Sequence, residues 1–396
     1  MQKFNGVAVV GAGPVGFLTA LGLARAGVPV LVLEAEAGIN DSPRAAGYFA
    51  TTLAILEQLG LKEDVEAVAY WSSTFSYRML ATGESIHVDT ARMLPPDAPY
   101  RQNAHFGQHI LAQIVLRHLL RLPNAQVRWN SRVVGLTQDG AGATLTIETP
   151  SGNEQIQADW VVGTDGARSS VRHLLGLPFE GHTWPERFVA TNLYYDFEKY
   201  GFEPANMIAD PVNWAVVARL GRENMWRLTY AEDSALDEAE ARKRIPQHYA
   251  AILPDTTAPY EIVASSPYRV HERCAPSFRV GRVLLAGDAA HACNPCGGMG
   301  LTGGVLDAMA VVQVLSAVIE GRAPESVLDF YSTERRRVFL EVSSPVATGY
   351  KQRLCQPDPV KRRADFEEFK ALAEAPEQAL MATTLSKLVE GNPMPV

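Results

Sequence analysis

The chain has few cysteines, no excess of positive charge and no long apolar run, and each shortage excludes a class of protein. Four cysteines among 396 residues are too few for a disulfide framework and fit a reducing compartment. The formal net charge of −8 leaves no basic footprint for nucleic acid. No apolar run approaches the roughly 20 residues that span a bilayer, and no signal-peptide pattern precedes the first predicted strand. We therefore expect a soluble, cytoplasmic protein that binds neither nucleic acid nor membrane.

A glycine-rich turn near the N-terminus carries the first chemical signal. It follows the apolar run from Val7 to Val10 and precedes an alanine-rich helical segment. Its residues are Gly11, Ala12, Gly13, Pro14, Val15 and Gly16. In a βαβ unit the first glycine permits the tight turn, the second lets a pyrophosphate approach the backbone, and the third lets helix and strand pack closely. The turn therefore predicts a dinucleotide site at a helix N-terminus.

A second apolar run, from Val30 to Leu33, ends in Glu34. A carboxylate at this place accepts hydrogen bonds from the ribose hydroxyls of a dinucleotide. It also repels a 2′-phosphate, so we expect FAD or NAD here rather than NADP. The alternative is a glycine-rich helix start that binds no ligand.

A second glycine signature lies far along the chain, at Gly287, Asp288, Ala289, Ala290 and His291. It resembles the flavin-binding GD motif of FAD-dependent aromatic monooxygenases of the para-hydroxybenzoate hydroxylase type (group A), and the resemblance covers most of the chain. It implies that Asp288 accepts a hydrogen bond from the ribityl chain of FAD. The next loop and helix start would face the flavin ring, through Gly298, Gly300, Leu301 and Thr302. Their backbone N–H groups would stabilise the negative charge of the reduced flavin, although the family more often has Asn in place of Thr302.

Three further positions match the same family. Asp165 and Gly166 follow the apolar strand that ends at Gly163, and they match the DG motif that is associated with FAD and the nicotinamide cofactor. Gln108 heads a predicted helix, where the family places a polar contact to the flavin. Arg44 falls where the family has an arginine near FAD and the incoming NADH or NADPH.

The resemblance implies an external monooxygenase. NADH or NADPH reduces the flavin, O2 adds at C4a, and the C4a-hydroperoxyflavin hydroxylates an electron-rich ring such as a phenol or hydroxypyridine anion. The candidate catalytic residues are His105, Tyr230 and Pro295. A histidine suits a base or proton relay because it titrates near neutrality, and His271 is a second candidate of this kind.

Candidate substrate contacts lie on strands of a predicted sheet. They are Asn192, Tyr194, Trp214 and Thr229. Asn192 and Tyr194 share one face of a strand, whereas Thr191 and Tyr195 share the other. Aromatic residues at this period are also typical of a sheet core, so packing is the competing interpretation.

Three segments resemble the branch of para-nitrophenol 4-monooxygenase and 6-hydroxy-3-succinoylpyridine hydroxylase. They begin at Ser42, at Trp184 and at Gly297. This branch hydroxylates the substituted carbon para to the hydroxyl and displaces the substituent. The alternatives are an ortho-hydroxylating phenolic acid monooxygenase and a non-catalytic FAD-fold binding protein.

Cys293 and Cys296 form a C-x-x-C pair two residues after His291. Thiols in such a pair can have a lowered pKa, so a flavin dithiol oxidoreductase is a further alternative. A His-Cys-Cys metal set is also conceivable, but His291 belongs to the GD motif and the loop already has a use beside the flavin. We therefore expect no metal.

The fold class that we predict is α/β, with a Rossmann-like FAD-binding domain, an inserted β-sheet substrate domain and a helical C-terminal tail. The FAD-binding domain would comprise residues 1–70, 100–182 and 272–340, the sheet domain 71–99 and 183–271, and the tail 341–396. Predicted strands cover 188–196, 213–220 and 225–231, with a hairpin between the last two. Predicted helices cover 109–122, 237–251 and 301–319, and Pro345, Pro357, Pro359 and Pro376 should break the tail. Apart from a small aromatic substrate and O2, a homodimer is the partner that we consider.

Overall fold

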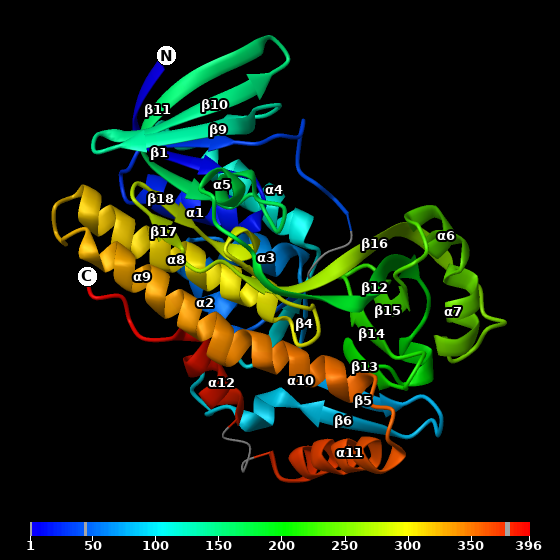
Figure 1. Ribbon diagram of the computed structural model, residues 1–396. Coiled ribbons are helices and arrows are strands. Elements are labelled where there is room, and N and C mark those ends of the chain that lie inside the picture. The colour runs from blue at the N-terminus through cyan, green and yellow to red at the C-terminus, as the bar shows by residue number, and fades with distance from the viewer. Residues whose placement is uncertain (1, 43–45, 377–380) are drawn as a thin grey trace.

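The structure, a computed structural model, describes residues 2–42, 46–376 and 381–396 (Figure 1). These residues form two eight-stranded sheets and a three-stranded sheet. In Figure 1 the sheet that contains the N-terminal strand lies at the upper left, and the second sheet lies at the right. Two long strands, β12 (Glu180–Tyr194) and β16 (Glu261–Cys274), connect the two regions.

The first sheet has the order β17-β18-β11-β1-β2-β8, and β10 and β9 extend it from β11. Its strands are β1 (Gln2–Val10), β2 (Val30–Leu33), β8 (Ala125–Arg128), β9 (Arg132–Asp139), β10 (Gly142–Thr149), β11 (Gly152–Gly163), β17 (Arg279–Val280) and β18 (Val283–Leu285). β1 pairs in parallel with β2 and β11, as the predicted βαβ unit requires. The helices that share its core include α1 (Pro14–Arg25), α4 (Gln108–Leu119) and α8 (Met299–Ile319). All four residues of β2 are buried, as in a parallel strand covered on both faces.

The second sheet has the order β19-β16-β12-β15-β14-β13-β5-β6. Besides β12 and β16 its strands are β5 (Thr74–Met79), β6 (Ser85–Asp89), β13 (Ala205–Ala209), β14 (Ala215–Arg219), β15 (Met225–Asp233) and β19 (His291–Ala292). Helices α6 (Glu238–Lys243) and α7 (Ile245–Ile252) pack on one face of it. A small sheet, β3 (Gly47–Tyr48), β7 (Asn103–His105) and β4 (Tyr70–Ser72), precedes α4. Helices α2 (Ala50–Gln58), α3 (Lys62–Val68) and α5 (Ser170–Leu174) pack in the core of the first sheet.

These elements confirm the predicted fold class, with its FAD-binding α/β region, β-sheet region and helical C-terminal region. The predicted hairpin is present, because β14 and β15 pair antiparallel across residues 221–224. The helix predicted over 237–251 is two helices, because Pro246 restarts the chain after Arg244. The boundaries that we predict between the domains stay a prediction.

One of the predicted breaks in the C-terminal tail is wrong. Helix α9 (Ser326–Val338) runs through a π-helical turn, Phe339–Ser343, into α10 (Ser344–Leu354), so Pro345 does not interrupt it. Pro345 lies in the first turn of α10, directly after the π-helical turn. The N–H that proline lacks is tolerated at this position. Helices α11 (Pro359–Glu374) and α12 (Met381–Glu390) follow.

Helix α8 also corrects the expectation that no apolar run is long enough to span a bilayer. Among the described residues it is the one helix of sufficient length and hydropathy, with 21 residues and a mean hydropathy of 1.7 in its most apolar window. However, 78% of that window is buried inside the protein. Its apolar composition is therefore explained by its place in the core.

Candidate flavin and substrate site

The first glycine turn has the geometry of a dinucleotide-binding turn. β1 ends at Val10, and α1 begins at Pro14 with Gly13 as its N-cap and no side-chain cap. A Cβ on Gly16 would lie 2.0 Å from the carbonyl oxygen of Gly11, so only glycine lets helix and strand pack this closely. A Cβ on Gly13 would meet no atom of the described residues within 4 Å. The backbone at Gly13 is therefore open to a phosphate group at the N-terminus of α1.

Glu34 lies beside this turn, directly after β2. Its Oε2 accepts a hydrogen bond of 2.7 Å from the Ala12 N–H, and its Oε1 accepts one of 2.9 Å from the Glu36 N–H. A carboxylate has about four acceptor sites, so it retains the capacity to accept from ribose hydroxyls. The position fits the role that we predicted for Glu34.

The two glycine signatures meet in space. A Cβ on Gly287 would lie 3.0 Å from Cγ2 of Val15, and a Cβ on Gly304 in α8 would lie 2.7 Å from the same atom. Gly287 has a φ of +59°, which favours glycine. Asp288 is exposed between the buried residues Gly287 and Ala289. The turn thus presents a carboxylate beside the N-terminus of α1, where FAD would have to extend.

A buried aspartate on α8 holds the GD turn. Asp307 is fully buried, and its Oδ2 accepts from the Gly287 N–H at 3.0 Å and pairs with Nε2 of His291 at 2.6 Å. Its Oδ1 accepts from Nε of Arg335 at 2.7 Å. Burial raises the pKa of Asp307, but His291 and Arg335 outweigh it and lower the pKa to about 2. Sequence analysis missed Asp307, although a lone acid inside an apolar helix was a signal.

The loop before α8 is shaped for a ligand on its outer side. Gly297 and Gly298 have φ values of +84° and +70°, and Gly298 is the N-cap of α8, without a side-chain cap. The first N–H groups of α8, which include that of Gly300, thus have no intrahelical acceptor. Pro295 is exposed, whereas its neighbours Asn294 and Cys296 are buried.

The predicted contacts at the start of α8 fall into two kinds. Leu301 and Gly300 lie in the first turn, so their backbone N–H groups are positioned as predicted. Thr302 donates its hydroxyl to the Gly298 carbonyl at 2.9 Å. Its side chain is therefore used within the helix. The open backbone at Gly13 and the uncapped N-terminus of α8 fit FAD, with its negative charges, at both ends.

The carboxylate of Asp165 accepts hydrogen bonds from its own loop and from the start of α5. Its Oδ1 accepts from Oγ of Ser169 at 2.5 Å, and its Oδ2 accepts from Oγ of Ser170 at 2.9 Å and from the Val171 N–H at 3.1 Å. The carboxylate thus shapes the DG loop, and a contact between it and the cofactor stays a prediction. Gln108 is half-buried at the first position of α4, as predicted. Arg44 lies outside the described residues.

The predicted substrate face contains a pair of buried polar residues. Asn192 on β12 and Arg227 on β15 are 6% and 7% exposed. Nε and Nη2 of Arg227 donate to Oδ1 of Asn192 at 3.0 and 2.9 Å. Thr229 lies on the same face of β15, two residues from Arg227, and is buried. Sequence analysis missed Arg227, although its spacing of two residues from Thr229 on one strand was a signal.

Tyr48, on β3 of the small sheet, is a third buried polar residue, and the charge of Arg227 acts on it. It is fully buried, its ring stacks on Phe106 at 4.1 Å between centroids, and its hydroxyl has no hydrogen-bond partner in the part of the chain that the structure describes. Burial raises the pKa of Tyr48, and the positive charge of Arg227 acts in the opposite direction. A buried hydroxyl without a partner is costly, so this position suits a polar group of a bound ligand.

Two of the other predicted substrate contacts differ in their surroundings. Trp214 is buried against Phe188, with 4.9 Å between ring centroids, in a cluster that includes Cys296 of the flavin loop. Tyr194 is 37% exposed at the end of β12, and its hydroxyl donates to Glu223 at 3.4 Å. Trp214 therefore lies nearer to the flavin loop than Tyr194 does.

The structure does not bring Tyr230 to the site. Tyr230 is fully buried and stacks on His248 of α7 at 4.2 Å between centroids. Successive residues of a strand point to opposite faces, so Thr229 and Tyr230 cannot share one. The same rule puts Thr191 under α7, where it contacts the Tyr249 hydroxyl at 2.6 Å, opposite Asn192 as predicted.

The two candidate histidine bases are placed differently. His105 on β7 is 4% exposed, and burial, with the charge of Arg219, lowers its pKa to about 4. It is therefore neutral and weakly basic near pH 7, which disfavours it as the base. His271 is half-buried, its pKa is also lowered by burial, and its Nδ1 lies 2.9 Å from Oγ1 of Thr183.

The cysteine pair does not have the properties of a reactive dithiol. Cys293 is half-buried and Cys296 is buried, and both thiols are free. Burial raises the pKa of both, so the thiolate that dithiol chemistry needs is disfavoured. Nε2 of His291 is already paired with Asp307, and within the described part of the chain no three such side chains could hold a metal ion together.

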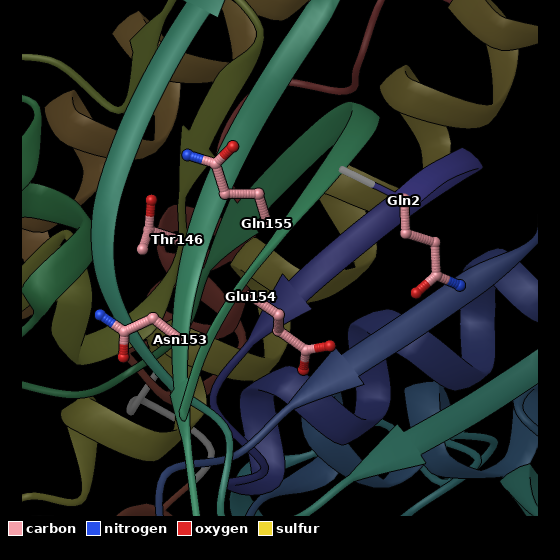
Figure 2. A pocket seen from close by; sticks show the side chains of 5 residues that line it. All are labelled: Gln2, Thr146, Asn153, Glu154 and Gln155. Carbon is pink, nitrogen blue, oxygen red and sulfur yellow. The ribbon is translucent and has the colours of Figure 1, made fainter. Parts of the chain in front are cut away.

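A separate open pocket lies far from these motifs. Its lining residues are Gln2, Thr146, Asn153, Glu154 and Gln155 (Figure 2). Gln2 begins β1 and Gly11 follows its end, and nine residues of strand span roughly 30 Å. This pocket therefore lies at the opposite end of β1 from the glycine turn.

The fold and its two joined glycine motifs define an FAD-dependent aromatic monooxygenase that uses NADH or NADPH as co-substrate. The chain belongs to the FAD binding domain family, which matches residues 5–344. It is 46% identical over 372 residues to para-nitrophenol 4-monooxygenase of Pseudomonas sp. (strain WBC-3), covering 93% of this chain and 92% of that protein.

Two more proteins show the same similarity. The chain is 42% identical over 367 residues to 6-hydroxy-3-succinoylpyridine 3-monooxygenase HspB of Pseudomonas putida (strain DSM 28022 / S16), covering 92% and 93% of the two chains. Its fold matches the crystal structure of p-nitrophenol 4-monooxygenase PnpA from Pseudomonas putida DLL-E4 with a TM-score of 0.95, at 44% identity, covering 99% and 100% of the two chains.

Proposed function

We propose that the enzyme hydroxylates a phenol or hydroxypyridine at the ring carbon para to the hydroxyl, and that the substituent on this carbon leaves. The full-length similarity to two named relatives supports this. Their names place the oxygen at C4 of para-nitrophenol and at C3 of a 6-hydroxy-3-succinoylpyridine. In both rings that carbon lies para to the hydroxyl and carries the substituent.

The observation that carries the proposal is the Arg227–Asn192 pair, whose positive charge also acts on the Tyr48 hydroxyl. A guanidinium in a buried setting stabilises an anion strongly, because water does not screen it. Arg227 would hold the ionised hydroxyl or an electron-rich substituent of the ring, and Asn192 fixes the guanidinium. FAD, when bound, supplies reduction by NAD(P)H and activation of O2, and an ionised ring is the partner that such oxygen transfer needs.

The test is a panel of para-substituted phenols and hydroxypyridines, each scored for stimulation of NAD(P)H oxidation and for product. Arg227→Gln should weaken the binding of ionised aromatics about tenfold or more, because a charge-assisted hydrogen bond is lost. Arg244→Gln, on the α7 side of the same sheet, is the control and should bind them normally. A catechol that retains the para substituent would favour ortho hydroxylation instead, and 18O entering from water alone would exclude a monooxygenase.

We also propose where the pyridine nucleotide docks. One face of β12 and β16 carries four basic residues, and the DG loop adds Arg168. The four are Arg187, Arg269, His271 and Arg273. Nε and Nη1 of Arg187 and Nε of Arg273 are buried and have no hydrogen-bond partner among the described residues. Buried cationic donors without an acceptor are costly, so this face suits a pyrophosphate.

Arg187→Gln tests this site, because it should slow flavin reduction by NAD(P)H and leave aromatic binding unchanged. Flavin reduction at the wild-type rate in Arg187→Gln would mean that the nucleotide binds at another site. We place the enzyme in the cytoplasm, where NAD(P)H is available. A homodimer stays a proposal that sedimentation of the purified protein would decide.

A further inference from the structure

The carboxylate of Glu272 joins three separate parts of the chain. Glu272 lies on β16 and is 7% exposed. Its Oε2 accepts from Nε1 of Trp184 on β12 at 3.1 Å, and from the backbone and side-chain nitrogens of Asn294 at 3.3 and 3.1 Å. Its Oε1 accepts from Oγ of Ser344, the first residue of α10, at 2.8 Å. One side chain thus holds the substrate sheet, the flavin loop and α10 together.

All four donors to this carboxylate are neutral. Lys351, the nearby buried cation, pairs with Glu186 instead. No ion pair to Glu272 occurs among the residues that the structure describes. Four hydrogen bonds compensate the burial of the charge, so the group is fixed in direction as well as in position. Removing the carboxylate would leave several buried donors without an acceptor.

The flavin loop is anchored from behind through this contact. Asn294 is fully buried, and while its Nδ2 donates to Glu272, its Oδ1 accepts from the Cys296 N–H at 3.0 Å. Both the nitrogen and the oxygen of the Asn294 side-chain amide are therefore hydrogen-bonded, which restrains the loop at this residue. Pro295 lies between these two anchored residues and is the one that faces outward. Two hydrogen bonds join Glu272 to Asn294, and the peptide bond joins Asn294 to Pro295.

Glu272 also belongs to the substrate sheet. Tyr268 and Val270 precede it at period two on the same face of β16, and they pack in one cluster with Trp214 and Cys296. β12, which carries Asn192, pairs with β16 along most of its length. A shift of this sheet on aromatic binding would move Glu272, and Glu272 would move Asn294.

We propose that Glu272 is a positioning residue that couples the substrate sheet to the flavin loop, so that aromatic binding at the sheet sets the position of Pro295 and of the N-terminus of α8. The proposal rests on the proposed function, because it needs an aromatic on the sheet face. In this proposal Glu272 acts without direct contact with the aromatic or the flavin. Its effect is transmitted through Asn294.

The experiment compares two substitutions that each remove one side-chain donor from Glu272. Asn294→Ala removes a donor on the loop side, and Ser344→Ala removes the donor on the α10 side as the matched control. Each holoenzyme is titrated with the para-substituted phenol that binds best to the wild type. The readouts are the aromatic dissociation constant, the change in the flavin absorption spectrum on binding, and the factor by which the aromatic accelerates flavin reduction.

Asn294→Ala should keep the wild-type aromatic dissociation constant but lose most of the spectral change, and the acceleration should fall about tenfold or more. Ser344→Ala should keep all three readouts. Equal effects of both variants would mean that Glu272 only stabilises the fold, and unchanged readouts in Asn294→Ala would also overturn the proposal. If no phenol or hydroxypyridine binds the wild type at all, it is the proposed function that fails.

Discussion

Two glycines three positions apart in the first turn should respond to alanine in opposite ways. A Cβ on Gly16 would lie 2.0 Å from the Gly11 carbonyl oxygen and 2.6 Å from Oγ1 of Thr164. Both contacts are with rigid or buried groups, so helix α1 must shift away from β1. Overpacking of this kind costs about 1–3 kcal/mol or more. Gly16→Ala should therefore destabilise the apoprotein.

Gly13→Ala should leave the apoprotein nearly as stable as the wild type. Its φ of −74° and ψ of 176° suit alanine, and the methyl group would meet no atom within 4 Å. The lower entropy of the unfolded chain adds about 0.4–1 kcal/mol of stability. Alanine is a poorer N-cap than glycine, by roughly 0.5–1 kcal/mol. The two terms are opposite and similar, so the net change should be small.

The binding of FAD separates the two positions. A methyl group on Gly13 occupies the open side of the turn, where a pyrophosphate would reach the N-terminus of α1. Gly13→Ala should therefore weaken FAD binding about tenfold or more, which is about 1.4 kcal/mol. The assays are quenching of flavin fluorescence on titration of the apoprotein, and thermal unfolding of the apoprotein alone. FAD binding by Gly13→Ala within about twofold of wild type would refute the assignment of this turn.

Three further outcomes are expected. Asp288→Ala should bind FAD about 10- to 100-fold more weakly, since a charge-assisted hydrogen bond contributes about 1.5–3 kcal/mol; equilibrium dialysis against FAD measures this, and normal retention would contradict it. In the unfolded chain His105 is protonated below about pH 6.5, whereas in the folded chain it is protonated only below about pH 4. The free energy of unfolding should therefore fall as the pH drops from about 6.5 to about 4. Denaturant titrations of wild type and His105→Leu check this, because the variant should lose that part of the slope. The Cys293→Ser/Cys296→Ser double variant should keep aromatic-dependent O2 uptake, and its loss would revive the dithiol alternative.

The sequence was sufficient for the parts of the site that depend on local backbone requirements. Gly16 has no room for a Cβ, and Gly287 has a positive φ, so only glycine fits and the motif is visible in the sequence. The helix start after Gly298 was predicted to within two residues for the same reason. Such requirements involve a few neighbouring residues and are readable without the fold.

The parts that depend on contacts distant in the sequence were not predictable. Period two correctly put Asn192 and Thr191 on opposite faces of β12, but it could not say which face α7 covers, and Tyr230 lies on the covered face of β15. Arg227 acquires its role from Asn192, which lies 35 residues earlier. The single helix predicted over 237–251 is a different kind of error, because Pro246 is visible in the sequence and marks the break between α6 and α7.

Two buried carboxylates flank the start of α8, and their different partners imply different roles. Asp307 has two cationic neighbours, His291 and Arg335, so its charge is neutralised and it acts as a clamp on the GD turn. Among the described residues Glu272 accepts hydrogen bonds only from neutral donors, so no cation offsets its charge beside the loop. After burial, that charge is the largest cause that raises the pKa of Cys293. The loop therefore disfavours an anion on its inner side, at the thiol, while the uncapped N–H groups of α8 favour one on its outer side. This asymmetry suits a flavin that gains negative charge when reduced, and it opposes a thiolate at the same place.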